Sequence, residues 1–144
     1  MNSVNLWNKA LDILSRREHS AYELKTKLKK FESDEKDLNE IIEKLKASNF
    51  IDDERFAIAF FRSKAQSGYG PSYISQYLLK KRVPSDIYDM NSLNIDWESL
   101  CRDQFEKKRH GKDINFKEKE KILRFLAYRG FSYEIIKSAL KEYD

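Results

Sequence analysis

The feature that most constrains this chain is a helical pattern that recurs along it at a nearly constant interval. Apolar residues four positions apart form the centre of each round: Leu24 with Leu28, Ile74 with Leu78, and Ile122 with Leu126. This spacing places both members of a pair on one face of an α-helix. The equivalent pairs lie about 50 residues apart, an interval that is typical of stacked helical units.

Helix-capping residues precede the apolar faces in every round. Ser20 with Glu23 and Asn115 with Glu118 fit the capping-box spacing, in which each side chain satisfies a free backbone N–H of the other residue. Single caps are expected at Asp52, Asp96 and Ser132. We therefore expect an all-α protein of three tandem three-helix repeats, spanning residues 1–49, 50–95 and 96–144. Each repeat holds few apolar residues, so neighbours should share surfaces in an elongated, curved array.

The pattern also predicts individual helices and their ends. The first helix should run from about Leu6 to Arg16, and Asn49 should end the third in a left-handed conformation. The fourth helix should turn Phe56, Ala59, Phe60 and Ser63 inward. A short sixth helix is expected around Ser85–Met90, followed by a connector over Asn91–Asn94.

Composition excludes several classes of protein. Charged residues make up 36% of the chain, and only four glycines and two prolines interrupt it, which favours helices over strands. The single Cys101 cannot form an internal disulfide, and the two histidines are too far apart in sequence for a metal cluster. The amino terminus lacks the apolar core of a signal peptide, and no run is long enough to span a membrane. We expect a cytoplasmic protein.

No residue group fits a catalytic pattern, so we expect no enzyme activity, no cofactor and no metal. His19 and Ser20 are sequence neighbours, and Ser20 is better explained as a cap. Cys101 lies on an apolar helical stripe. The carboxylates of residues 52–54 stand at a helix start, where a structural role suffices. The turn Gly68-Tyr69-Gly70-Pro71 lacks the lysine and hydroxyl of a phosphate-binding P-loop.

The region from Arg55 to Ser85 differs from the rest because it contains no acidic residue. This region is either a binding surface or an ordinary solvated face. The net charge of +4 is compatible with both interpretations and does not distinguish them. Cations that can bind phosphate combine here with an aromatic ring, Tyr69, which we expect to be free for contact. The candidate residues of this first set are Arg62, Lys64, Tyr69, Lys80, Lys81 and Arg82. A second set comprises Lys108, Arg109, Lys112, Arg124 and Arg129. Whether the two sets share one face depends on the tertiary structure.

Several segments together resemble a known family. Residues from Phe50 to Ala57, the turn Gly68-Tyr69-Gly70-Pro71, and Ile74 are similar to the central signature of the RecX regulatory proteins. The later motifs agree: Asp96-Trp97, Arg102-Asp103-Gln104, and Lys121 to Phe131. Residues Ala10 to Leu28 resemble the opening repeat of the family. Glycine is common near the end of the middle helix in such repeats, but this chain has Arg82 there in the second repeat and Phe31-Glu32 in the first.

This resemblance implies a helical, non-enzymatic protein without a cofactor that modulates the RecA recombinase. Family members lie in the groove of the RecA–DNA filament, suppress its ATPase and strand-exchange activities, and bind single- and double-stranded DNA. We accordingly expect a monomer whose partners are the filament and DNA. Two other hypotheses stay open: a stand-alone DNA-binding module of the helix–turn–helix type, and a purely structural helical adaptor.

Overall fold

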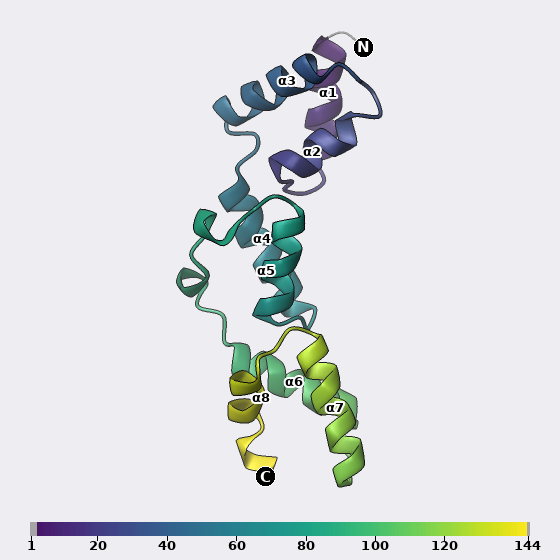
Figure 1. The fold of residues 1–144 in the computed structure, drawn as a ribbon, viewed down its shortest axis with the longest axis vertical. Helices are drawn as coiled ribbons and strands as arrows, with labels where there is room; N and C mark the ends of the chain where they lie inside the picture. The colour runs from purple at the N-terminus through teal and green to yellow at the C-terminus, as the bar shows by residue number, and fades with distance from the viewer. Residues whose placement is uncertain (1–2, 144) are drawn as a thin grey trace. The chain divides into compact units, whose positions relative to one another are not determined.

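The computed structural model describes residues 3–143, which form eight α-helices and three short 3-10 turns (Figure 1). The α-helices are α1 (Ser3–Leu14), α2 (Ala21–Leu28), α3 (Glu35–Ala47), α4 (Asp53–Gln66), α5 (Pro71–Lys80), α6 (Trp97–Arg109), α7 (Phe116–Tyr128) and α8 (Tyr133–Ala139). The 3-10 turns are η1 (Ser85–Ile87), η2 (Met90–Leu93) and η3 (Lys141–Tyr143). The described residues contain no β-strand, so the all-α class is confirmed.

The contacts of the chain divide it into two compact units. Among the described residues, unit 1 takes in 3–59 and Leu78–Tyr88, and unit 2 takes in Phe60–Tyr77 and 89–143. The division falls within α4 and α5, so each unit receives one part of each of these helices.

Unit 1 is built around α1, α2 and α3, which all pack against one another (Figure 1). Its core consists of aliphatic side chains at helical spacing: Leu6, Ala10, Leu24, Leu28, Leu38, Ile41, Ile42, Leu45 and Ile51. The helices are short, and burial of this shared core stabilises each of them more than helix propensity does.

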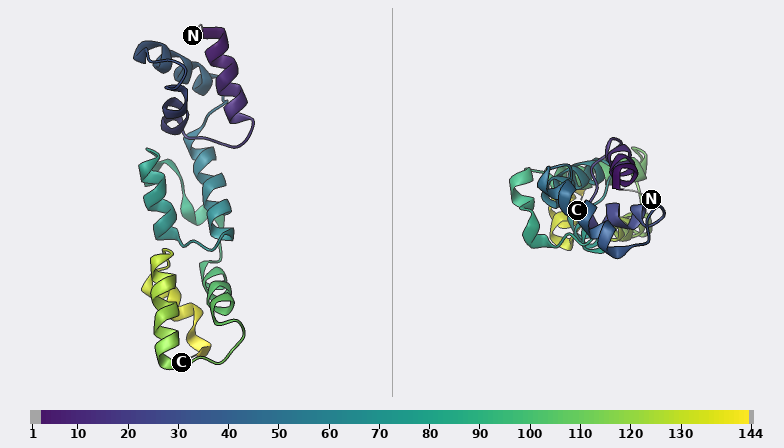
Figure 2. Two further views of the ribbon diagram at one scale, coloured as in Figure 1. Left: turned by 90° about the vertical axis from the view of Figure 1, so that its right-hand side faces the viewer. Right: turned by 90° about the horizontal axis from the view of Figure 1, so that it is seen from above.

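Unit 2 is built around α6, α7 and α8, and α6 packs against both of the others (Figure 2). Its core combines side chains of all three helices: Cys101, Phe105, Ile122, Leu126, Phe131, Ile136, Ala139 and Leu140. Within the described part of the chain, no helix is both long enough and apolar enough to cross a membrane.

The helix starts that were predicted from capping residues are confirmed. Ser20 Oγ accepts the N–H of Glu23 at 3.1 Å, and Asp52 Oδ1 accepts the N–H of Arg55 at 3.1 Å. The same arrangement occurs in unit 2, where the caps of α6, α7 and α8 are Asp96, Asn115 and Ser132. Each cap satisfies a backbone donor that the helix itself leaves unpaired. Local sequence therefore sets where these helices begin.

The predicted inner face of α4 is wrong in two positions and off by one residue in a third. Phe56 is buried as expected, but Ala59 and Ser63 are exposed and Phe60 is only half-buried. The side chains that α4 buries further along are Ala57, Phe61 and Ala65. A period of 3.6 residues allows either of two adjacent phenylalanines to face inward, so the helical pattern alone does not choose between them.

Two other expectations about the helices need correction. The first helix begins at Ser3 and ends at Leu14, so Ser15 and Arg16 lie beyond it. The region from Ser85 to Leu93 forms the two 3-10 turns η1 and η2 in place of a short α-helix and a connector. Leu93 is the one side chain that these two turns bury, and so the segment lacks the apolar face that stabilises a longer helix.

Candidate functional site

The predicted binding residues are distributed over both units. Lys80, Lys81 and Arg82 belong to unit 1, at the end of α5. Arg62, Lys64 and Tyr69 belong to unit 2, together with every residue of the second set. The acid-free stretch is therefore shared between the units: its middle part, Phe60–Tyr77, belongs to unit 2, and both of its ends belong to unit 1.

Unit 2 contains a column of aromatic rings from α4, α5 and the turn between them. Phe60 stacks on Tyr77 with 5.1 Å between ring centroids and 19° between planes. Tyr77 lies 6.2 Å from Tyr73, and Tyr73 stacks on Tyr69 at 4.3 Å. The tyrosines stand four residues apart in sequence, which brings Tyr73 and Tyr77 to one side of α5. The four rings thus form a continuous strip.

Cations from distant parts of the chain join this strip. Lys64 Nζ lies 5.6 Å from the ring centroid of Tyr69, and the Arg129 guanidinium carbon lies 4.5 Å from it. Arg129 also lies over Phe125 at 4.9 Å, and Lys108 Nζ lies over the same ring at 4.2 Å. Cation–π attraction holds such groups against ring faces. We call the strip together with its cations the aromatic–cation ladder: Phe60, Tyr77, Tyr73, Tyr69, Lys64, Arg129, Phe125 and Lys108.

The ladder brings together members of both sequence-predicted sets. Lys64 and Tyr69 come from the first set, and Lys108 and Arg129 from the second. The expectation that the Tyr69 ring is free is wrong, because Tyr73 stacks against it and Arg129 and Lys64 also lie over it. Its part in the ladder is to hold two cations in place.

Backbone contacts fix the middle of the ladder. Gly70 donates its N–H to the carbonyl of Arg129 at 2.8 Å, and Ser72 donates to the carbonyl of Gly130 at 3.1 Å. Gly130 has a φ of +102°, and a Cβ there would lie 2.5 Å from Tyr73 Cβ. A glycine is therefore required for this close approach. The Arg129 side chain also donates to the carbonyl of Ser67 at 3.3 Å.

A cavity of about 720 Å³ in unit 2 extends the cationic surface beyond Phe125. Its basic lining residues are Lys108, Arg109, His110, Lys112 and Lys121. Arg109 is partly engaged, because it pairs with Glu106 at 2.9 Å and donates to the carbonyl of Lys112 at 2.8 Å. Hydrogen bonds from Tyr143 and Arg109 lower the pKa of Glu106, so this carboxylate stays charged and offsets Arg109. Lys108, Lys112 and Lys121 are exposed.

The remaining predicted cations of unit 2 lie outside the ladder. Arg62 and Arg124 are exposed on α4 and α7. Arg124 also lines a smaller cavity between α7 and α8, beside the exposed ring of Tyr133. Neither arginine contacts the aromatic strip, and each is a peripheral candidate for phosphate contact.

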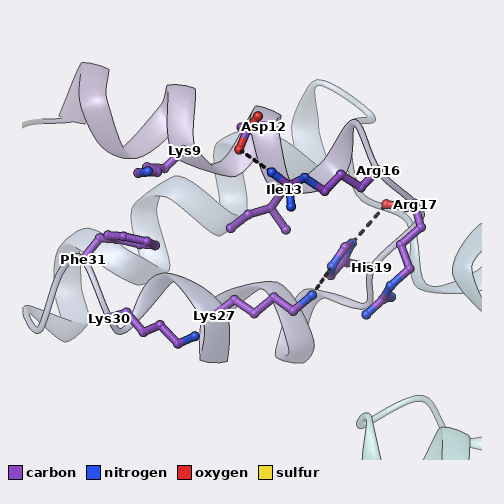
Figure 3. A pocket seen from close by; sticks show the side chains of 9 residues that line it. All are labelled: Lys9, Asp12, Ile13, Arg16, Arg17, His19, Lys27, Lys30 and Phe31. Carbon is purple, nitrogen blue, oxygen red and sulfur yellow. Dashed lines mark hydrogen bonds and ion pairs between the residues drawn. The ribbon is translucent and has the colours of Figure 1, made fainter.

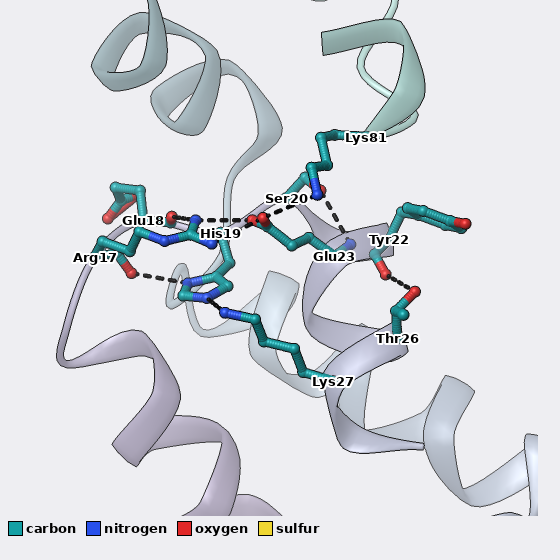
Figure 4. Close-up of polar contacts among 9 residues, drawn as sticks. All are labelled: Arg17, Glu18, His19, Ser20, Tyr22, Glu23, Thr26, Lys27 and Lys81. Atoms are coloured by element: carbon teal, nitrogen blue, oxygen red, sulfur yellow. Dashed lines mark hydrogen bonds and ion pairs between the residues drawn. The ribbon is translucent and has the colours of Figure 1, made fainter. Parts of the chain in front are cut away.

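Lys81, one of the predicted basic residues of unit 1, is engaged in a contact within that unit (Figure 4). Lys81 Nζ lies 3.5 Å from the buried carboxylate of Glu23, and Arg17 donates to both oxygens of that carboxylate at 2.9 Å. Burial alone would raise the pKa of Glu23, but the hydrogen bonds of Arg17 and the charges of Arg17 and Lys81 lower it. Glu23 thus binds Arg17 and Lys81 instead of closing the expected capping box with its carboxylate.

Arg82 takes the left-handed conformation with a φ of +61°, at the turn where the family resemblance suggests glycine. Its guanidinium lies 5.1 Å from the ring centroid of Tyr22. An L-residue in this conformation costs about 1 kcal/mol, and the contact with Tyr22 offsets part of that cost. Lys80 is exposed. Of the three basic residues at the end of α5, Lys80 is therefore the least engaged.

Sequence reasoning did not include Phe60, Tyr73, Tyr77 or Phe125 in the candidate site. The four-residue spacing of the tyrosines was a visible signal for the strip. Nothing local indicated Phe125, because its role depends on Arg129 and Lys108 meeting it from separate elements.

The candidate site consists of basic and aromatic side chains. The described residues contain no group of three or more histidine, cysteine, aspartate or glutamate side chains that could hold a metal ion. Burial raises the pKa of the Cys101 thiol to about 11, which keeps it protonated and unreactive as a nucleophile. Guanidinium and ammonium groups on aromatic faces suit a polyanion.

Three models of one protein family match consecutive segments that together cover most of the chain. Residues 7–45, 52–90 and 96–140 match the models of the first, second and third three-helix domains of RecX, respectively. A curated relative from Cronobacter sakazakii, named Regulatory protein RecX, is 36% identical over 96% of this chain and 92% of its own length. A relative of the same name from Salmonella typhi is 32% identical over 97% of this chain and 92% of its own.

Solved structures agree in fold. The crystal structure of RecX from Lactobacillus salivarius superposes with a TM-score of 0.79 at 27% identity, covering 97% of this chain and 95% of the other. A second crystal structure, of a regulatory protein RecX, has a TM-score of 0.75 at 23% identity. It covers 94% of this chain and 71% of the other, and at this identity it supports the fold alone.

Proposed function

Because this chain belongs to the RecX family of regulatory proteins, we propose that it binds the RecA–DNA filament and lowers its ATPase and strand-exchange activities. The relatives carry the name of a regulatory protein, and regulation by binding needs no catalytic group in this chain. We further propose that it acts as a cytoplasmic monomer, with repeat boundaries after residues 49 and 95.

The observation that carries this proposal is the aromatic–cation ladder. It concentrates Lys64, Arg129 and Lys108 on ring faces that hold their charges in fixed positions. A filament of recombinase on DNA presents phosphates at regular intervals, and cations that contact them release condensed counterions. Preorganised cations lose less conformational entropy on binding than free lysines do.

The rings contribute in a second way. Tyr69, Tyr73 and Tyr77 are each only half-buried, so part of each side chain is exposed along the strip. Aromatic side chains beside a cationic groove are the usual platform for single-stranded nucleic acid, whose bases can stack on or against them. The ladder therefore fits single strands and duplex backbones, with the cations supplying most of the affinity.

The direct test measures DNA-dependent ATP hydrolysis by the cognate recombinase while this protein is titrated in. Wild-type protein should lower the rate at stoichiometric concentrations. The double variant Lys64→Glu/Arg129→Glu should lose most of the effect, because both cations of Tyr69 become repulsive toward phosphate. The matched control Lys117→Glu/Lys141→Glu reverses two exposed charges of unit 2 outside the ladder and should inhibit as wild type does.

An unchanged rate with the wild-type protein would reject regulation of the recombinase. If the protein then still bound duplex DNA with a preference for base sequence, it would act as a stand-alone DNA-binding module, since phosphate contacts carry no sequence information. Charge reversal of Lys80, Lys81 and Arg82 addresses the structural-adaptor hypothesis, which expects no functional loss from it.

A further inference from the structure

A second cationic site lies in unit 1, in a cavity of about 480 Å³ between α1 and α2 (Figure 3). Five basic side chains line it: Lys9, Arg16, Arg17, Lys27 and Lys30. Among the described residues that line the cavity, Asp12 is the one carboxylate. None of these residues belongs to the ladder or to either basic set found in the sequence, so the site is separate from the proposed binding surface.

The positive charge of this cavity is only partly compensated. Asp12 pairs with Arg16 at 3.6 Å, and Glu23 pairs with Arg17 at 2.9 Å. Among the described residues, the structure pairs neither Lys27 nor Lys30 with a carboxylate. Two ammonium groups in one cavity, neither of them in an ion pair, create a potential that favours an anion.

The contact between Lys27 and His19 fixes one of these ammonium groups. His19 Nδ1 lies 3.0 Å from the carbonyl oxygen of Arg17, which can only accept, so Nδ1 carries the proton. His19 Nε2 is then an acceptor for the Lys27 ammonium at 2.7 Å. Because this bond uses one N–H of Lys27, two further donors remain for a ligand. The buried imidazole thus holds Lys27 in position.

The electrostatics of the cluster agree with this geometry. Burial lowers the pKa of His19 and of Lys27, and the positive charge of Arg17 lowers both further. Each of these groups is therefore surrounded by more positive than negative charge. A bound anion would reverse that imbalance.

The cavity also has apolar side chains in its wall. Phe31 and Ile13 line it, and Lys9 Nζ lies over the Phe31 ring at 4.8 Å. Figure 3 shows Phe31 and Lys9 at the end opposite Arg16 and Arg17. Volumes of about 300–1,000 Å³ that combine apolar walls with a few charged groups are typical of small-molecule sites.

We propose that this cavity binds a phosphate group, carried either by a free nucleotide or by the end of a DNA strand. Lys27 and Lys30 donate to the phosphate oxygens, Arg16 adds positive charge from the loop after α1, and Phe31 with Ile13 contacts the attached sugar or base. A phosphate monoester carries up to two negative charges, which matches the two unpaired ammonium groups. The proposal does not depend on the recombinase, because it concerns the isolated chain.

The test is calorimetric titration of the full chain at low salt with four probes: inorganic phosphate, ATP, and a short oligodeoxynucleotide with and without a 5′-phosphate. The variant Lys27→Gln/Lys30→Gln removes both unpaired charges. Charged hydrogen bonds of this kind correspond to at least about a tenfold change in Kd, so the variant should bind the preferred probe ten times more weakly or worse. The control Lys29→Gln/Lys44→Gln removes two exposed charges of unit 1 outside the cavity and should bind like wild type.

The probes distinguish the two sources of phosphate. Saturable binding of ATP that the cavity variant loses supports a free nucleotide. A preference for the phosphorylated oligodeoxynucleotide, lost in the same variant, supports a strand end. Equal affinity in the cavity variant and the control for every probe overturns the proposal, as does the absence of saturable binding to all four. If Lys27→Gln unfolds the protein, Lys9→Gln/Lys30→Gln provides the same comparison with two exposed residues.

Discussion

His19 shows how one buried side chain couples the α1–α2 loop to α2. Its relative exposure is 2%, and its two ring nitrogens bind the carbonyl of Arg17 and the ammonium of Lys27. Burial, Arg17 and Lys27 lower its pKa, while the Arg17 carbonyl and the Glu23 carboxylate oppose the shift. The folded state therefore favours the neutral imidazole.

The lower pKa of His19 in the folded chain predicts that the stability of the protein depends on pH. The unfolded chain takes up a proton at His19 near the ordinary pKa of 6.5, whereas the folded chain does so only at lower pH. The free energy of unfolding should fall as pH drops below 6.5 and level off below the folded pKa. His19→Gln should remove this part of the dependence, because glutamine does not titrate. Chemical denaturation at pH 7.5 and 5.5 measures it, and parallel changes in both proteins would contradict the prediction.

Two adjacent arginines provide a second residue-scale comparison. Arg17 binds Glu23, whose side chain is 8% exposed, while Arg16 pairs with Asp12, whose side chain is 62% exposed. Arg17→Met should lower the free energy of unfolding by about 2 kcal/mol, since a buried carboxylate loses its main partner while Lys81 remains. Arg16→Met should change it by no more than about 0.5 kcal/mol. Denaturant unfolding compares the two, and equal losses would show that burial of Glu23 does not matter.

At the scale of elements, the caps join residues that are close in sequence, whereas the glycine contacts join segments that are far apart in sequence. Ser20, Asp96 and Ser132 each bond to a backbone N–H three positions further on. Gly70 and Gly130, by contrast, bring together the α4–α5 and α7–α8 connections. A cap starts one helix, whereas this glycine pair determines how α5 meets the end of α7.

Replacing the glycines separates backbone strain from close packing. Gly130→Ala should lower the free energy of unfolding by about 3 kcal/mol, because its φ of +102° is strained for alanine and the new Cβ would lie 2.5 Å from Tyr73. Gly111→Ala has a φ of +68° and open space around it, and should cost only about 1 kcal/mol. Thermal unfolding checks the order of the two, and a Gly111→Ala variant as unstable as Gly130→Ala would refute it.

At the scale of the whole molecule, the proposed function depends on charges that separate elements bring together. Lys64, Arg129 and Lys108 come from α4, from the end of α7 and from α6, and they share the rings of Tyr69 and Phe125. A single lysine on an exposed face contributes little to affinity, but several fixed cations act together on one polyanion.

The salt dependence of DNA binding should report this set directly. Each of Lys64→Gln, Lys108→Gln and Arg129→Gln should reduce the slope of log K against log salt by roughly one, uniformly across DNA sequences. Lys117→Gln, on an exposed position outside the ladder, should leave the slope unchanged. Fluorescence anisotropy with a labelled oligonucleotide over a range of salt concentrations measures it. Slopes that stay at the wild-type value in all three variants would exclude the ladder as the contact surface.

The sequence by itself determined the fold class, the starts of the capped helices and the left-handed stop at Asn49, where φ is +62°. These properties depend on hydrogen bonds and spacings within a few residues, so they can be inferred from local pattern. It also identified Lys64, Tyr69, Lys108 and Arg129 as candidates by charge and composition. The prediction that α4 buries Phe60 failed, because the helical period does not distinguish two neighbouring phenylalanines.

Only the tertiary structure decided which candidates meet and which are engaged elsewhere. Phe61 is buried because Trp97 of α6 lies beside it, with 6.3 Å between ring centroids. Lys81 is held by a carboxylate of α2, and Arg129 reaches Tyr69 through a glycine contact between distant turns. Such partners are far apart in sequence, and their interaction arises from side-chain packing and burial that no local pattern encodes.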